Sequence, residues 1–188
     1  MLKIARSMAI LGGVVLVALV VITCVSVLGR SANTLGHTPW IVSLFEPLAA
    51  LFKKLGPVRG DFELVEAGVA FAIFCFLPWC QMVQGHATVD LVTNYLPEPA
   101  RRFLTMLWEV LLAAVLGIIT WRLIVGTLDK AGNGETTFLL QFPVWWAFAA
   151  CAAAAVVASV IGAYVAVIRM QELAKNTDLL VRDAGVGH

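Results

Sequence analysis

The sequence predicts an all-α integral membrane protein with four transmembrane helices. Of its 188 residues, 61% are hydrophobic and only 13% are charged, whereas about a quarter of the residues in soluble domains carry a charge. Four apolar stretches reach the roughly 20 residues that a membrane helix needs. Their length and periodicity do not suit barrel strands, so helices must satisfy the backbone inside the bilayer. The net charge of +1 gives no bulk attraction to nucleic acid, and no nucleic-acid partner is expected.

The first apolar stretch, residues 8–28, is interpreted as a retained membrane span. Lys3 and Arg6 precede it, as in a secretory signal peptide. The stretch has 21 residues without a charge, however, while the apolar region of a signal peptide has about 7–15. The following "LGRSANTLG" offers no convincing cleavage site.

Three further spans are expected at about residues 63–82, 103–128 and 142–168. With the first span they make a single four-helix domain over residues 1–170, followed by a polar cytoplasmic tail over residues 171–188. The fourth span is long enough to cross the membrane while tilted. Indole rings favour the headgroup level, and five tryptophans fall near the expected span ends: Trp79, Trp108, Trp121, Trp145 and Trp146.

Small residues recur every four positions along the fourth span, at Ala150, Ala154, Ala158 and Gly162. This spacing places them on one face of a helix, where small side chains let another helix approach closely. We therefore expect the stripe to pack against a helix and treat it as a candidate subunit contact.

An amphipathic segment, residues 41–55, separates the first two spans. It is too short and too polar on one side to cross the membrane, and Pro47 interrupts it. Its pattern suits a helix in the membrane interface and equally a helix packed on a neighbouring membrane subunit. Its apolar residues follow helical spacing: Ile41, Leu44, Phe45, Leu48, Leu51, Phe52 and Leu55.

Enzymatic and cofactor chemistry is not expected. His86 and Asp90 stand four residues apart, but a zinc site needs three or four ligands and no third histidine or cysteine is near. The three histidines, His37, His86 and His188, lie outside the spans, which disfavours a haem site between two histidines. No phosphate-binding glycine loop and no activated nucleophile are found. The four cysteines lie in apolar stretches and are interpreted as small buried residues.

A few charged residues fall in or beside the spans. Glu63 and Glu66 begin the second span; carboxylates there favour the helix dipole, and contact with a partner is the alternative. Glu109 and Arg122 stand 13 residues apart in the third span, which is about 20 Å along a helix, too far for direct pairing. Each is expected near a membrane interface.

The connector "GHATVDLVTNYLPEPARRFL" joins the second and third spans. Pro97 and Pro99 suit the start of the third helix, where proline is tolerated. Arg101 and Arg102 stand at the helix end where the dipole disfavours cations. Lipid phosphates and the excess of positive charge on the cytoplasmic side account for them. The connector is therefore expected in the cytoplasm, in contact with membrane lipids.

The same connector resembles the small membrane subunit of tripartite ATP-independent periplasmic (TRAP) transporters. "GHATVDL" and the following "LPEPARR" are similar to that family's connector, "FELVEAG" to the start of its second span, and "FPVWWAF" to the start of its fourth. The resemblance covers essentially residues 8–170, although the connector before the second span is longer than is usual in the family. These motifs mark the following candidate residues: Glu63, Glu66, Gly85, His86, Asp90, Pro97, Arg101, Arg102, Pro143 and Trp145.

The resemblance implies a subordinate role in transport. A soluble periplasmic binding protein captures an organic acid, a large membrane subunit moves it inward with sodium, and the small subunit associates with the large one in the bacterial inner membrane. The sequence agrees with this role. Transporters usually show internal repeats and broken helices around a midplane site, whereas these four spans show no convincing repeat and almost no polar residues at mid-depth. The alternative is the membrane-anchor subunit of a redox enzyme.

Basic residues do not decide the orientation of the chain. With the N-terminus inside, the inner segments hold seven lysines and arginines and the outer segments six. The family resemblance implies that both termini are cytoplasmic.

Overall fold

The computed structural model describes residues 1–37, 58–83 and 98–175 of the chain. It confirms the predicted all-α fold, with four helices that are long and apolar enough to cross a membrane. The expected amphipathic segment and most of the connector before the third span lie outside the described residues, as does most of the tail. The four helices are α1 (Leu2–Gly36), α4 (Asp61–Val83), α6 (Glu98–Asn133) and α7 (Val144–Lys175).

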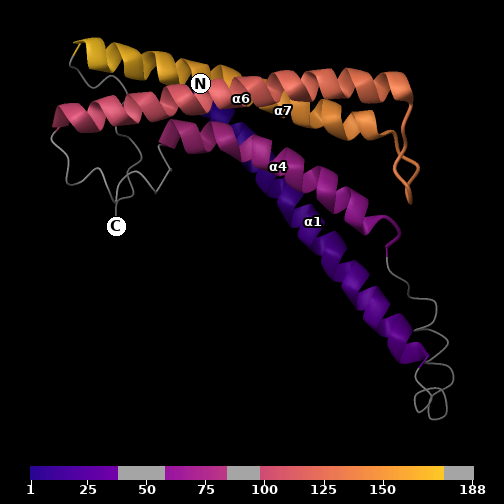
Figure 1. The fold of residues 1–188 in the computed structure, drawn as a ribbon. Helices are drawn as coiled ribbons and strands as arrows, with labels where there is room; N and C mark the ends of the chain where they lie inside the picture. Colours follow the sequence, from indigo (N-terminus) through magenta and orange to yellow (C-terminus); the bar gives the residue numbers. More distant parts are fainter. Residues whose placement is uncertain (38–57, 84–97, 176–188) are drawn as a thin grey trace, which may run out of the picture.

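The helices form two antiparallel pairs, α1 with α4 and α6 with α7. The two pairs meet where α4 contacts α7. Helix α1 packs on α4, α6 packs on α7, and α4 also packs on α7. Figure 1 shows α6 and α7 side by side along their length, while the second half of α1 diverges from them. Half of the most apolar part of α7 is buried in the protein, against 11% in α1 and 17% in α4 and α6. Helix α7 is therefore the central helix of the bundle.

Successive helices run in opposite directions, so the start of α1 lies toward the same end of the bundle as the ends of α4 and α7 (Figure 1). At that end Ala5, Ile161 and Val165 form a buried cluster, which Trp79 and Met82 cover from α4. The start of α1, the end of α4 and the end of α7 therefore meet. We call this the terminal end of the bundle.

The seam between α1 and α4 is built on steps of seven residues in both helices. A Cβ atom at Gly12 would lie 2.8 Å from the Cβ of Cys75, and one at Gly68 would lie 2.7 Å from a methyl group of Leu19. One step further along, the hydroxyl of Ser26 donates to Asp61. A repeat of seven keeps one face of each helix in contact when two helices wind gently around each other. Glycine at two of the steps brings the helices unusually close.

The seam between α6 and α7 contains a pair of hydroxyl groups, Thr120 and Ser159, 2.7 Å apart. Thr120 Oγ1 also lies 3.2 Å from the carbonyl oxygen of Ala155, and Ser159 Oγ lies 3.3 Å from that of Leu116. Each hydroxyl carries one proton, so two of these three hydrogen bonds form at a time. The pair fixes the register of the two helices, with Thr120 buried and Ser159 half-buried.

Candidate functional site

The two acidic residues that open the second span have different environments. The carboxylate of Glu63 accepts hydrogen bonds from the backbone N–H groups of Leu139 and Leu140, at 2.7 and 3.1 Å. Glu66 is exposed. The loop between α6 and α7 is therefore held on the first turn of α4 by Glu63, which does more than complement the helix dipole.

Close packing accompanies this contact. Gly60 has φ +78°, and a Cβ atom there would lie 2.4 Å from Cγ of Leu140. Both the backbone conformation and the missing side chain are needed for Leu140 to sit over the start of α4. Sequence reasoning did not single out Gly60, although a glycine directly before an acidic helix start is a detectable signal.

Asp61 ties α1 to the same place. One carboxylate oxygen accepts from the Ser26 hydroxyl and lies 3.9 Å from the Arg30 guanidinium, and the other accepts from the N–H of Phe62. Ser26 is completely buried. Asp61 and Glu63 thus join α1, α4 and the α6–α7 loop at the end of the bundle opposite the terminal end. Both carboxylates bind groups of this chain, so the arrangement is a structural lock, and we call it the acidic lock.

The "FPVWWAF" motif forms the turn into α7. The carbonyl oxygen of Phe142 accepts from the N–H of Thr137 at 2.8 Å, and the carbonyl of Glu135 accepts from the N–H of Val144 at 3.0 Å. The ring of Phe142 lies edge-on to Trp146 at 5.7 Å, and Trp145 lies 5.9 Å from Trp146. Pro143 immediately precedes the helix, and Trp145 and Trp146 are exposed. These rings suit the headgroup level of a membrane.

The small-residue stripe of α7 lies mostly inside the subunit. Ala154 is 3% exposed and Ala158 is fully buried, whereas Ala150 is exposed. A Cβ atom at Gly162 would lie 2.8 Å from the side-chain amide of Gln81. The predicted close approach is therefore made by helices of the same chain. A role of these residues in contact with a second subunit stays a prediction.

The connector motif is only partly described. Gly85, His86, Asp90 and Pro97 lie outside the described residues. Arg101 and Arg102 belong to the first turns of α6, as expected. No described group of three or more His, Cys, Asp or Glu side chains is arranged to hold a metal ion.

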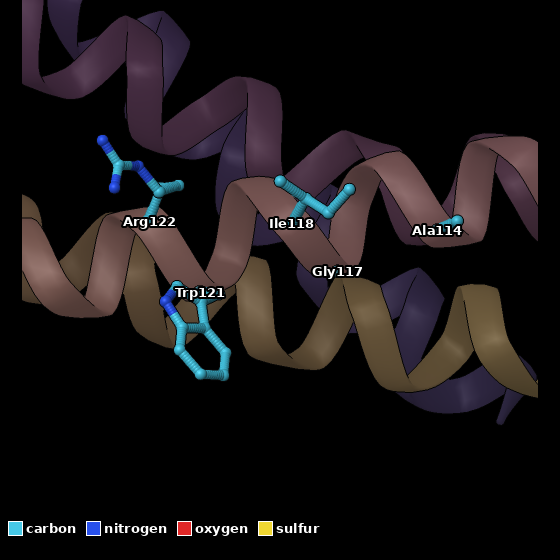
Figure 2. Close-up of a pocket in the computed structure, with 5 residues that line it drawn as sticks. All are labelled: Ala114, Gly117, Ile118, Trp121 and Arg122. Atoms are coloured by element: carbon cyan, nitrogen blue, oxygen red, sulfur yellow. The ribbon is translucent and has the colours of Figure 1, made fainter.

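The third helix differs from expectation in length and in the surroundings of its charged residues. It continues to Asn133, so Arg122 lies well inside it, where it was expected near an end. Glu109 is only 4% exposed and interacts with other groups of the protein. Arg122 is exposed on the outer side of α6 and borders a shallow depression together with Ala114, Gly117, Ile118 and Trp121 (Figure 2). The depth of Arg122 depends on the register between α6 and α7, which the composition of one helix does not reveal.

Comparison with known protein families gives a match to a transporter component. The model of the DctQ component of tripartite ATP-independent periplasmic transporters matches residues 48–172, about two thirds of the chain. The match includes α4 and α6 and most of α7. It gives no support to a redox-enzyme anchor. Searches of curated proteins and of solved structures returned no match. With four helices able to span a membrane and a family model that covers most of its length, the chain belongs to the DctQ family, the small permease components of TRAP transporters.

Proposed function

We propose that this subunit acts as a scaffold for the large permease subunit of a sodium-driven TRAP transporter that imports an organic acid. A periplasmic substrate-binding protein would deliver the acid. The observation that carries the proposal is that several polar groups of the described helices interact with other groups of the same chain, so these groups do not form a substrate or ion site. Thr120 and Ser159 lie within hydrogen-bond distance of one another, Ser26 donates to Asp61, and Glu109 is 4% exposed and interacts with other groups of the protein, although its Oε2 has no hydrogen-bond partner among the described residues. Arg122 of α6 is an exception, because it is exposed on the outside of the bundle.

Continuous helices support the same conclusion. Sites for substrates and ions in secondary transporters are commonly built where membrane helices are broken, because unwound backbone then faces the ligand. Helix α4 runs through Pro78 without interruption, and the other three described helices are continuous as well. The subunit therefore offers structural support, with translocation assigned to the large subunit.

For orientation, we propose that both termini and the connector 84–97 face the cytoplasm. The start of α1 and the ends of α4 and α7 lie together at the terminal end (Figure 1). The acidic lock and the aromatic turn before α7 would then lie at the periplasmic surface, on the side where a binding protein delivers substrate.

The driving ion and substrate class are tested with the complete transporter in proteoliposomes. With the binding protein outside and an inward sodium gradient, we expect accumulation of a labelled carboxylate that matches the specificity of the binding protein. Replacing sodium by potassium on both sides should abolish accumulation, and a proton ionophore should leave it intact. Uptake that follows a proton gradient without sodium would contradict the proposed coupling.

A further inference from the structure

The register of α6 against α7 places Arg122 deep along the bundle. Thr120 binds Ala155 and Ser159, which lie near the middle of the apolar segment Val144–Gln171 of α7. Arg122 follows two residues later, which is about 3 Å further along the helix axis. The end of α6 at Asn133 is 11 residues beyond Arg122, a distance of about 16 Å.

The guanidinium of Arg122 is exposed on the outside of the bundle at this depth. None of the residues that the structure describes forms a hydrogen bond or ion pair with it. Intramembrane arginines are costly, and they generally face protein or water and pair with another group. The middle of the hydrocarbon layer lies about 15 Å from either headgroup region, so about 12 Å remain between the Arg122 backbone and the nearer headgroups, which is further than an arginine side chain extends. A lipid phosphate is therefore a poorer partner here than a carboxylate at the same depth.

The surface beside Arg122 is a shallow depression along α6. A Cβ atom at Gly117 would meet nothing within 4 Å, so the helix backbone is accessible there, and Ala114 continues the shallow floor. Ile118 and Trp121 are 65% and 70% exposed. Figure 2 shows Ile118 and Arg122 projecting from one side of α6 and Trp121 from the other. Small residues between larger ones let a second membrane helix approach closely.

We infer that this outer face of α6 is the surface that binds the large permease subunit, through a membrane helix whose carboxylate pairs with Arg122. The inference rests on the proposed function, since it assigns the contact face of the proposed complex. Charge complementarity identifies the partner: a desolvated guanidinium binds a carboxylate through two parallel hydrogen bonds. The small residues Ala154 and Ala158 of α7, by contrast, are already buried within the chain.

The test measures how much tagged large subunit co-purifies with variants of this chain from membranes that contain the whole transporter. Gly117→Leu fills the shallow depression, and Gly13→Leu is the matched control, because Gly13 also lies in a membrane helix with nothing within 4 Å of its Cβ position. Arg122→Leu removes the charge, and Arg59→Leu is its control outside the helices. We expect each α6 variant to lower co-purification roughly tenfold or more, and each control to leave it unchanged.

A charge reversal identifies the partner group. Arg122→Glu should abolish co-purification, and changing one intramembrane carboxylate of the large subunit to arginine should restore it. Circular dichroism of each variant monitors the helices of the subunit itself. Unchanged co-purification by both Gly117→Leu and Arg122→Leu would overturn the inference. So would loss by Gly117→Leu alone, because the charge pair would then be absent.

Two other outcomes separate the possible causes. If Arg122→Leu only reduces the phosphatidylglycerol retained by the purified subunit, in native mass spectrometry, the occupant is a lipid headgroup and the inference is wrong. If the unaltered chain fails to co-purify with the large subunit, the proposed function itself fails. If the large subunit co-purifies equally with the unaltered chain and with both α6 variants, the proposed contact face is wrong but the proposed function still stands.

Discussion

At the scale of single residues, Gly12 and its neighbour Gly13 have opposite surroundings. Gly12 faces the α1–α4 seam, where a Cβ atom would meet Cys75 at 2.8 Å and the backbone oxygen of Ala72 at 3.2 Å. A Cβ atom at Gly13 would meet nothing within 4 Å. The two positions therefore form a natural pair for testing how closely the helices must pack.

We expect Gly12→Val to destabilise the subunit by about 1–3 kcal/mol, the usual cost of overpacking, and Gly13→Val to have a much smaller effect. Thermal unfolding of the purified subunit in detergent compares the two variants. Equal stability of both variants would contradict the close α1–α4 seam.

The acidic pair at the start of α4 gives a second comparison at this scale. Glu63→Ala removes the acceptor for the N–H groups of Leu139 and Leu140, so these amides should exchange hydrogen faster. Glu66→Ala removes an exposed carboxylate from the same helix turn and should leave their exchange unchanged. Hydrogen exchange followed by mass spectrometry over the α6–α7 loop measures the difference. Equal effects of both variants on amide exchange would show that Glu63 only interacts with the helix dipole and does not hold the α6–α7 loop.

At the scale of the elements, the seam between α6 and α7 contains a contact between two hydroxyl groups whose contribution can be measured. Thr120→Ala and Ser159→Ala each remove one of the partners that lie 2.7 Å apart. A double-mutant cycle on unfolding should give a coupling free energy of about 0.6 kcal/mol, and at most about 1.7, the range measured for such bonds in membrane proteins. Additive single effects would show that the two hydroxyls do not stabilise one another.

The existence of the four helices follows from apolar length alone, and the sequence predicts it for that reason. The relations between helices do not follow in the same way. Gly12 contacts Cys75, and seven residues later Leu19 contacts Gly68. This seven-residue spacing is visible in the sequence only when the two helices are compared with one another. Glu63 likewise shows its acidic character in the sequence, but its bonds to Leu139 and Leu140 bring together residues more than seventy positions apart.

At the scale of the whole molecule, the alternating helices predict the sidedness of the two connectors. Single cysteines at Thr93 and Asn133, in a chain whose four natural cysteines are replaced, should react with a membrane-impermeant maleimide from opposite sides. Thr93 should react only in inverted vesicles and Asn133 only in intact spheroplasts. Reaction of both from one side would contradict the four-span topology.

Assembly into a transporter is predicted from the sequence only through the family resemblance. Burial inside the chain now accounts for Ala154 and Ala158, which the spacing alone left available for another subunit. Arg122 is the converse case, because the bundle leaves it exposed at the level of the middle of α7. Both distinctions depend on which helix face the other three helices cover, and no single-helix pattern contains that information.

Uptake with each component omitted in turn tests the central claim most directly. Proteoliposomes with a sodium gradient would contain the large subunit with or without this chain, in the presence or absence of the binding protein, and accumulation of the labelled acid is measured. The account predicts uptake only when all three components are present, and none by this chain alone. Full uptake without this chain, or any sodium-driven uptake by this chain alone, would contradict it.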